Sequence, residues 1–462
     1  MSSASLKNAG KYLYPRETAR HAATILGFPS KVSIAPAYYE SACTDIASLA
    51  AAISAHEPVR LYTRPEDVSK ANSMVAQAST KYLSETTNIS VIPFLTNHLW
   101  VRDTGPVYVQ GIDQDTRQQR FAINFRFSEW GRKADIGDHD RASDGMDWPV
   151  MESEQLQENA SFAKRVIESD QFPSRVTTLE SSVCIEGGAL VVDGEGTLLA
   201  TESSILNDNR NPDLSRADIE AELSRLLGVE KIIWFPGKKD LDVTDVHADA
   251  EVNFIQPGVV VLSRPHSSAP REWIKIFEDI KAILEQSVDA KGRRFEIHTV
   301  QEPDPRCLGE LSYEEPATNY VNFYFVNGGI IIPQFGDIQT DKEALELFQK
   351  LCPDRVVRPV HVTALPLAGG NNLQTPLATH VNANNSKRFE TFRTSLATLV
   401  TKATTKAKGH RDGPTFQSIY DDLDDEEERK DNLARNPAFD ASGNWVPPPD
   451  KLWLSDLMVL GN

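Results

Sequence analysis

The feature that most constrains the fold is a hairpin pattern that recurs along the chain. Four segments each hold two apolar stretches separated by a short polar or glycine-containing turn: residues 106–125, 189–201, 252–263 and 321–335. In the last of them, Asn327-Gly328 supplies the positive φ that a tight hairpin turn requires. The pattern therefore predicts repeated antiparallel strand pairs.

Each hairpin is followed by a helical or loop stretch and then by a short apolar strand. Helices are predicted at 215–228, with a Ser cap and a Gly stop, and at 271–287. The short strands are residues 231–235, 294–300 and 356–365. The repeating unit is strand–strand–helix–strand, with low identity between copies. Mixed sheets around one axis, with the hairpin ends near a common centre, explain this repeat. An α+β domain with unrelated hairpins is the alternative.

Charge and cysteine content narrow the class of protein. The chain has 462 residues, and its 66 acidic against 48 basic side chains give a net charge of −18. This balance argues against nucleic-acid and anionic-membrane partners and is compatible with a cationic small ligand. No signal-peptide core and no run of about 20 apolar residues is present. We therefore expect a cytoplasmic globular protein. The four cysteines lack metal-clip or CxxC spacing: Cys43, Cys184, Cys307 and Cys352.

The C-terminal part of the chain differs in composition from the rest. Residues 402–412 are basic and polar, and residues 421–428 are an acidic run. Like-charge blocks of this kind are usually solvated. We expect a folded domain over residues 1–387 and a partly disordered appendage over residues 388–462.

The first of three polar clusters lies at the start of a predicted hairpin. Arg102 and Asp103 stand between Trp100 and a Gly-Pro turn. One interpretation is a structural Arg–Asp contact. The functional interpretation places Asp103 in a pocket beside Trp100, where a carboxylate next to an aromatic face suits a flat cation.

The other two clusters also precede predicted hairpins. Glu186 comes before two glycines, which would let the backbone approach a ligand closely. In an extended segment His247 and Asp249 would share a face, so that one anchors a cation while the other moves protons. The alternatives are an exposed Glu at a glycine-rich strand entry and a chance His-x-Asp pair.

Taken together and in this order, the clusters resemble the agmatine deiminase family, within the peptidyl-arginine deiminase-like group. The resemblance covers roughly residues 12–385 and implies an α/β fold, a five-bladed propeller (pentein) of strand–strand–helix–strand blades. This agrees with the repeat described above. The strings that carry it are residues 14–21, 100–106, 124–133, 186–212, 244–249 and 317–337.

The resemblance also implies a reaction and a set of site residues. In the family a Cys thiolate attacks the guanidinium carbon, and the products are ammonia and a ureido compound, on a route to putrescine and polyamines. No metal or organic cofactor is implied. By motif match Asp103 and Asp249 clamp the cation and His247 is the acid/base. Further pocket residues are Glu186 and Trp100, with Asn322 and Gln334 on matching segments.

The family's nucleophile is missing from its expected place. In residues 365–381 the Cys position falls on Gln374 in one alignment and on Leu377 in another. Cys352 stands at a predicted helix end, where a thiol is commonly a small buried hydrophobe. Cys184, near Glu186, is a weak candidate for the nucleophile. Hydroxyls and an imidazole also lie nearby, but an unactivated hydroxyl is a poor nucleophile for this carbon: Thr375, Thr379 and His380.

Three hypotheses follow. In the first, the chain is a guanidine deiminase whose C-terminal loop is altered. In the second, it is a non-catalytic relative that binds a guanidinium ligand or a partner protein. In the third, it is a hydrolase in which water attacks directly. A structural alternative is that the clamp residues only hold the sheets together. Agmatine, a modified arginine and an arginine in a small peptide present the same group, and the oligomeric state, including a homo-oligomer, stays open.

Overall fold

Five sheets carry the part of the chain that the computed structural model describes. The described residues are 11–82, 88–112, 119–131, 151–170, 175–308, 317–367 and 377–380. They all belong to one unit, residues 1–382. The predicted appendage, Gln374 and Thr375 lie outside the described residues, so those predictions stay untested.

Each sheet joins an antiparallel pair to a parallel strand. Three sheets have three strands: β10 (Lys231–Phe235), β9 (Thr197–Thr201) and β8 (Val191–Val192); β11 (Val252–Gln256), β12 (Val259–Arg264) and β13 (Glu296–Gln301); and β14 (Tyr324–Val326), β15 (Gly329–Gln334) and β16 (Val356–His361). Two have four strands: β1 (Tyr12–Leu13), β5 (Val107–Gly111), β6 (Arg120–Asn124) and β7 (Val176–Glu180); and β17 (Leu377–His380), β2 (His21–Gly27), β3 (Val59–Thr63) and β4 (Ile89–Pro93).

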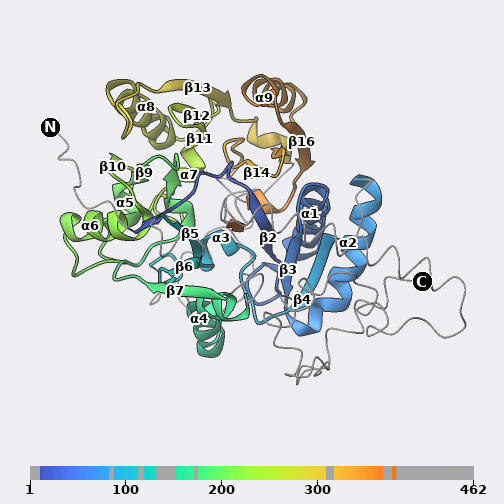
Figure 1. The fold of residues 1–462 in the computed structure, drawn as a ribbon. Helices are drawn as coiled ribbons and strands as arrows, with labels where there is room; N and C mark the ends of the chain where they lie inside the picture. Colours follow the sequence, from blue (N-terminus) through green and yellow to red (C-terminus); the bar gives the residue numbers. More distant parts are fainter. Residues whose placement is uncertain are drawn as a thin grey trace, which may run out of the picture. The chain divides into compact units, whose positions relative to one another are not determined.

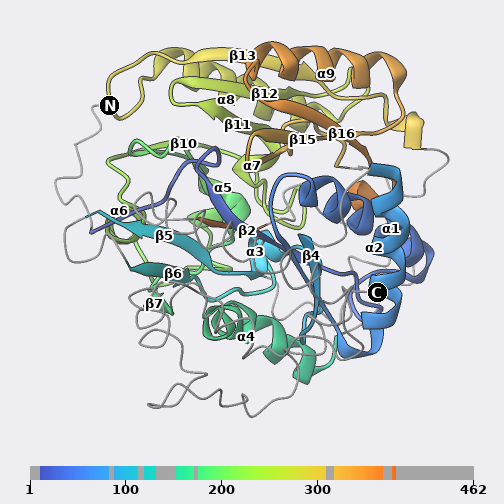
Figure 2. The same ribbon diagram turned by 45° about the vertical axis from the view of Figure 1, so that its right-hand side comes forward.

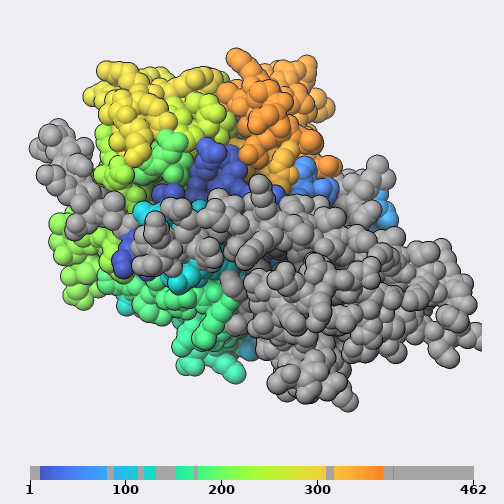
Figure 3. Space-filling view, viewed as in Figure 1, coloured from blue at the N-terminus to red at the C-terminus, as the bar shows by residue number. Residues whose placement is uncertain are grey.

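A helix links the second strand of each antiparallel pair to its parallel neighbour, which confirms the predicted strand–strand–helix–strand unit. Of these helices, α8 and α9 form much of the upper surface of the described part (Figures 1–3), whereas α1 is mostly buried and packs against α2. The linking helices are α1 (Pro36–Ser54), α4 (Ser153–Ser169), α6 (Arg216–Leu227), α8 (Arg271–Gln286) and α9 (Ile338–Leu351), with α2 (Val68–Tyr82) between β3 and β4.

Local sequence signals set the limits of several elements. Ser215 accepts a hydrogen bond from the backbone of Asp218 at the start of α6, and Gly228 ends this helix at φ 68°. Gly328 turns the β14–β15 hairpin at φ 73°, as predicted. The strand predicted over 356–365 ends earlier, at His361. Beyond it the buried Asp45 carboxylate accepts the backbone N–H groups of residues 363–365, so this segment leaves the sheet.

The fifth sheet joins the two ends of the described chain. β17 pairs antiparallel with β2, so that Leu377 lies opposite Ile25 and His380 opposite His21. The fifth copy of the unit is therefore assembled from residues more than 350 positions apart in sequence. The sequence pattern alone did not reveal this pairing.

Short helical turns precede the first strand of three hairpins. They are α3 (Val101–Thr104) before β5, the 3-10 turn η4 (Gly187–Ala189) before β8, and α7 (Ala248–Glu251) before β11. Both α3 and α7 contact η4, and they lie toward the middle of the described part (Figures 1 and 2). The residues before equivalent strands therefore meet in one place. Within the described ranges, no helix is both long enough and apolar enough to cross a bilayer.

Candidate active site

The three turns bring the three polar clusters of the sequence together around Gly188. A Cβ atom placed on Gly188 would lie 2.6 Å from His247 Nδ1 and 2.8 Å from both Asp103 Oδ1 and Asp249 Oδ2. A side chain at this position would therefore overlap all three groups. Glycine is required here because the backbone of η4 approaches the cluster closely.

Asp103 is held by one hydrogen bond on each carboxylate oxygen. The backbone N–H of Gly188 donates to Oδ1 at 2.9 Å, and the indole N–H of Trp130 donates to Oδ2 at 2.9 Å. The side chain is 13 % exposed, so the carboxylate still reaches the surface of the site. Each oxygen keeps a further lone pair, which is the arrangement that a planar cation with paired N–H groups needs.

His247 lies between two carboxylates. Its Nε2 is 3.2 Å from Glu186 Oε2, and its Nδ1 is 3.8 Å from Asp103 Oδ2. The imidazole is buried, and burial lowers the pKa of His247, but the charges of Asp103 and Glu186 outweigh this effect and raise the pKa to about 9. At neutral pH the ring therefore carries a proton that it can donate.

The raised pKa of His247 predicts a specific pH dependence of stability. In the unfolded chain a His has a pKa of about 6.5. The folded protein therefore gains stability from the protonated ring below pH 6.5, and loses it as the pH rises through 9. Between pH 6 and pH 10 we expect the free energy of unfolding to fall by about 3 kcal/mol more in the wild type than in His247→Gln. Urea unfolding at each pH measures this difference, and parallel curves for the two proteins would contradict it.

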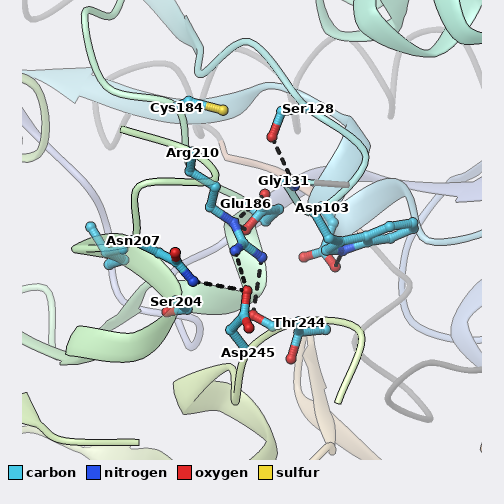
Figure 4. Close-up of polar contacts among 12 residues, drawn as sticks. Asp103, Ser128, Gly131, Cys184, Glu186, Ser204, Asn207, Arg210, Thr244 and Asp245 are labelled. Carbon is cyan, nitrogen blue, oxygen red and sulfur yellow. Dashed lines mark hydrogen bonds and ion pairs between the residues drawn. The ribbon is translucent and has the colours of Figure 1, made fainter. Parts of the chain in front are cut away.

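A buried network of hydrogen bonds around Arg210 holds Glu186 in place. Arg210 Nε lies 3.0 Å and 2.9 Å from the two Glu186 oxygens, and Arg210 Nη1 donates to Asp245 Oδ2 at 2.7 Å. Asn207 donates to the same Asp245 oxygen (Figure 4). Both Arg210 and Glu186 side chains are fully buried. Burial raises the pKa of Glu186, but Arg210 and His247 outweigh it and hold the pKa below its ordinary value, so Glu186 stays ionised beside the imidazole.

Asp249 is fixed through its own backbone. Its carbonyl accepts a hydrogen bond from Asn322 Nδ2 at 2.9 Å, and Asp249 as a whole residue is only 2 % exposed. Asn322 is also buried, and among the described residues its Oδ1 has no hydrogen-bond donor. Asn322 thus lies beside Asp249, one of the predicted site residues. Gln334 ends β15, where its carbonyl accepts the N–H of Val362.

Several local expectations were wrong. His247 and Asp249 do not alternate along an extended segment, because His247 caps α7 and Asp249 lies inside this helical turn. Arg102 does not pair with Asp103: its guanidinium donates to Glu17 at 2.8 Å. Trp130 supplies the indole that bonds Asp103, and it lies in the same core cluster as Trp100, whose place beside the pocket stays a prediction.

The surroundings of the four thiols differ, and the role of Cys184 as a candidate nucleophile stays a prediction. Cys184 Sγ donates to the carbonyl of Arg126 at 3.2 Å. Figure 4 shows Cys184 in the upper part of the view, as it does Ser128, above Arg210. Cys352 ends α9, as predicted. Burial raises the pKa of Cys352 to about 11, that of Cys307 to about 11 and that of Cys43 to about 12. A thiol with a raised pKa is a poor source of thiolate at neutral pH.

Three site residues could not be identified individually from the sequence. Trp130, Arg210 and Asp245 all lie in strings already noted as shared with the family, but nothing in those strings shows which side chain turns inward. In the part of the chain that the structure describes, no group of three or more His, Cys, Asp or Glu residues is arranged to hold a metal ion.

Residues 13–372 match the Porphyromonas-type peptidyl-arginine deiminase family. The chain belongs to this family. The match confirms the resemblance inferred from the sequence, and it stops two positions before Gln374.

Relatives and solved structures agree with this assignment. The agmatine deiminase of Stutzerimonas stutzeri is 32 % identical over 375 residues, which cover 78 % of this chain and 93 % of the relative. That of Pseudomonas savastanoi pv. phaseolicola is 33 % identical over 339 residues, covering 70 % of this chain and 83 % of the relative. Among structures, the agmatine deiminase of Enterococcus faecalis shares 23 % identity with a TM-score of 0.67, over 82 % of this chain and all of that chain. The fold is therefore the mixed α/β fold of these hydrolases.

Proposed function

We propose that the site binds a guanidinium group between Asp103 and Asp249 and converts it to a ureido group with release of ammonia. The observation that carries the proposal is the convergence of Asp103, His247 and Asp249 on one point beside Gly188. Two carboxylates that converge on one point offer paired acceptors to the N–H groups of a planar cation. The relatives named agmatine deiminases support agmatine or another arginine-derived compound as the substrate.

The residues divide the reaction between them. Asp103 and Asp249 orient the cation so that its carbon faces the attacking group. As the attacking group bonds to the guanidinium carbon and a C–N bond breaks, protonated His247 gives its proton to the departing ammonia. The neutral ring then takes a proton from the water that adds to this carbon, displaces the attacking group and completes the ureido group. Asp103 and Glu186 together keep His247 protonated in the resting state, Glu186 with its carboxylate 3.2 Å from Nε2.

A second candidate function is guanidinium binding without turnover. The observation that favours it is the state of the thiols: Cys184 is bonded to a backbone carbonyl, and the pKa values of the other three are raised by burial. A Cys-to-Ser variant of the Campylobacter jejuni agmatine deiminase was solved with substrate bound. Binding in this fold can thus be separated from turnover.

The five sheets support a closed architecture for this site. Because β17 pairs with β2, the last described strand joins a sheet whose other strands, β2, β3 and β4, come from the start of the chain. We propose that the sheets are the blades of a five-bladed ring, with the turns α3, η4 and α7 at its centre.

Release of ammonia and ureido product tests the function. Purified protein is assayed with agmatine, free arginine and a short arginine peptide, alongside titration calorimetry with agmatine. We expect Asp249→Asn to weaken binding, and any turnover, by roughly 30-fold or more, because it removes one charge of a desolvated pair. Asp279→Asn, a partly exposed residue on α8, is the control.

The outcomes separate the two candidates. Turnover that Asp249→Asn abolishes supports the deiminase, whereas binding without turnover supports the second candidate. Neither binding nor turnover in the wild type would leave these residues a structural role only and would overturn the proposal.

A further inference from the structure

The backbone around the site is strained in two segments. Within the described residues, every non-glycine residue with positive φ lies in residues 126–130 or residues 240–246: Arg126, Glu129, Trp130, Asp240, Asp245 and Val246. Such residues are sterically disfavoured and persist where the surrounding structure holds them, often at functional sites. Both segments end at the candidate active site, since one carries Trp130 and the other leads into His247.

The two strained segments contact each other through Asn209. A Cβ atom on Gly131 would lie 2.5 Å from the Asn209 side chain, which in turn donates to Asp245 Oδ2 at 3.0 Å. Residues 126–131 therefore contact the Arg210–Asp245 network through Asn209. Its position is set by buried hydrogen-bonded groups and not by a free loop conformation.

The ring of Trp130 is fixed on its other side by aromatic contacts. Its centroid is 4.9 Å from that of Phe127 and 5.0 Å from that of His98, in edge-on geometry. His98 is itself held by Glu129 at 2.8 Å. With its ring packed in this way, the indole N–H of Trp130 points at Asp103 Oδ2, the same oxygen that lies 3.8 Å from His247 Nδ1.

We propose that Trp130 is a positioning residue for the guanidinium site. Its indole N–H fixes the plane of the Asp103 carboxylate and keeps Oδ2 from bonding directly to His247. Together with the N–H of Gly188 on Oδ1, it leaves one lone pair of each oxygen directed at the ligand. The proposal rests on the proposed function for the clamp role of Asp103, but its consequence for His247 is independent of turnover.

The consequence is a change in the titration of His247. The charged groups around the imidazole are Asp103 from α3, Glu186 before η4, Asp249 from α7 and, behind Glu186, Arg210. Removing the indole donor leaves Asp103 Oδ2 free to accept from His247 Nδ1. The protonated imidazole is then stabilised further, and the titration midpoint of His247 rises.

The variant Trp130→Phe tests this because it keeps an aromatic ring and deletes only the donor. The titration of His247 is followed by NMR in protein with labelled histidines, with His247→Gln used for assignment. We expect a higher midpoint in Trp130→Phe and at least tenfold weaker agmatine binding. The matched control is Trp234→Phe, since Trp234 also donates to a carboxylate, Glu220, at 2.8 Å on α6. A midpoint in Trp130→Phe equal to or below that of the control overturns the proposal.

Two cases need a separate interpretation: a Trp130→Phe variant that does not fold, and a wild type that does not bind agmatine. If Trp130→Phe does not fold, the indole ¹H–¹⁵N signal of Trp130 is compared between wild type and Asp103→Asn: an upfield shift in the variant supports the bond, and an unchanged signal overturns the proposal. If the wild type neither binds nor turns over agmatine, the proposed function fails, and a raised His247 midpoint then supports only the claim that Trp130 keeps Asp103 Oδ2 from bonding to His247.

Discussion

Gly188→Ala is expected to remove guanidinium binding and turnover while leaving a folded protein. The added methyl group would overlap His247 Nδ1, Asp103 Oδ1 and Asp249 Oδ2, at 2.6–2.8 Å. Gly188 does not have a left-handed backbone, so alanine is strained only by these contacts. Displacing a positioned group by about 1 Å can lower a rate by about 100-fold, so we expect a loss of at least this size.

Ammonia release and calorimetric binding of agmatine measure the effect of Gly188→Ala. The control is Gly292→Ala, because no atom lies within 4 Å of a Cβ at that position. Gly292 has φ 82°, so its variant will lose some stability, but its site will be intact. Full activity or full binding in Gly188→Ala would show that the three groups do not share one site.

The second large effect is expected on stability. Arg210→Met should lower the free energy of unfolding by about 3–5 kcal/mol, because it leaves the Asp245 carboxylate buried without a cation and the Glu186 carboxylate with only His247. Glu186 is then expected to take up a proton, since Arg210 is the main cause of its lowered pKa after the opposing effect of burial.

A double-variant cycle separates this pair from general damage to the core. Glu186→Gln with Arg210→Met removes one charge of each sign, so its stability should lie above the sum of the two single effects. Urea unfolding of the four proteins gives the coupling. Strict additivity of the two substitutions would contradict a direct Arg210–Glu186 contact.

Much of the fold was predictable from local sequence. Turn residues such as Asn327-Gly328 and caps such as Ser215 and Gly228 act over a few positions, and the structure places them as expected. The pairing of β17 with β2 was not predictable in this way, because it joins strands more than 350 residues apart and neither carries a signal for its partner.

The site was predictable in its membership more than in its geometry. Asp103, His247 and Asp249 were recognised by motif, and they converge. The local conformation of α7 was not, because His-x-Asp fits an extended segment as well as a helical turn. Trp130 was not identified because no glycine at that position signals its left-handed backbone. The surrounding contacts impose this conformation. Arg210 reaches Glu186 from 24 residues away, beyond the range of a local pattern.

Calorimetric titration of the wild-type protein with agmatine tests the guanidinium site most directly, with putrescine as a ligand that keeps an amine but lacks the guanidinium group. We expect saturable binding of one agmatine per site at neutral pH, with no binding of putrescine at the same concentrations. Equal binding of both, or binding of neither, would contradict the claim that Asp103, His247 and Asp249 form a guanidinium site.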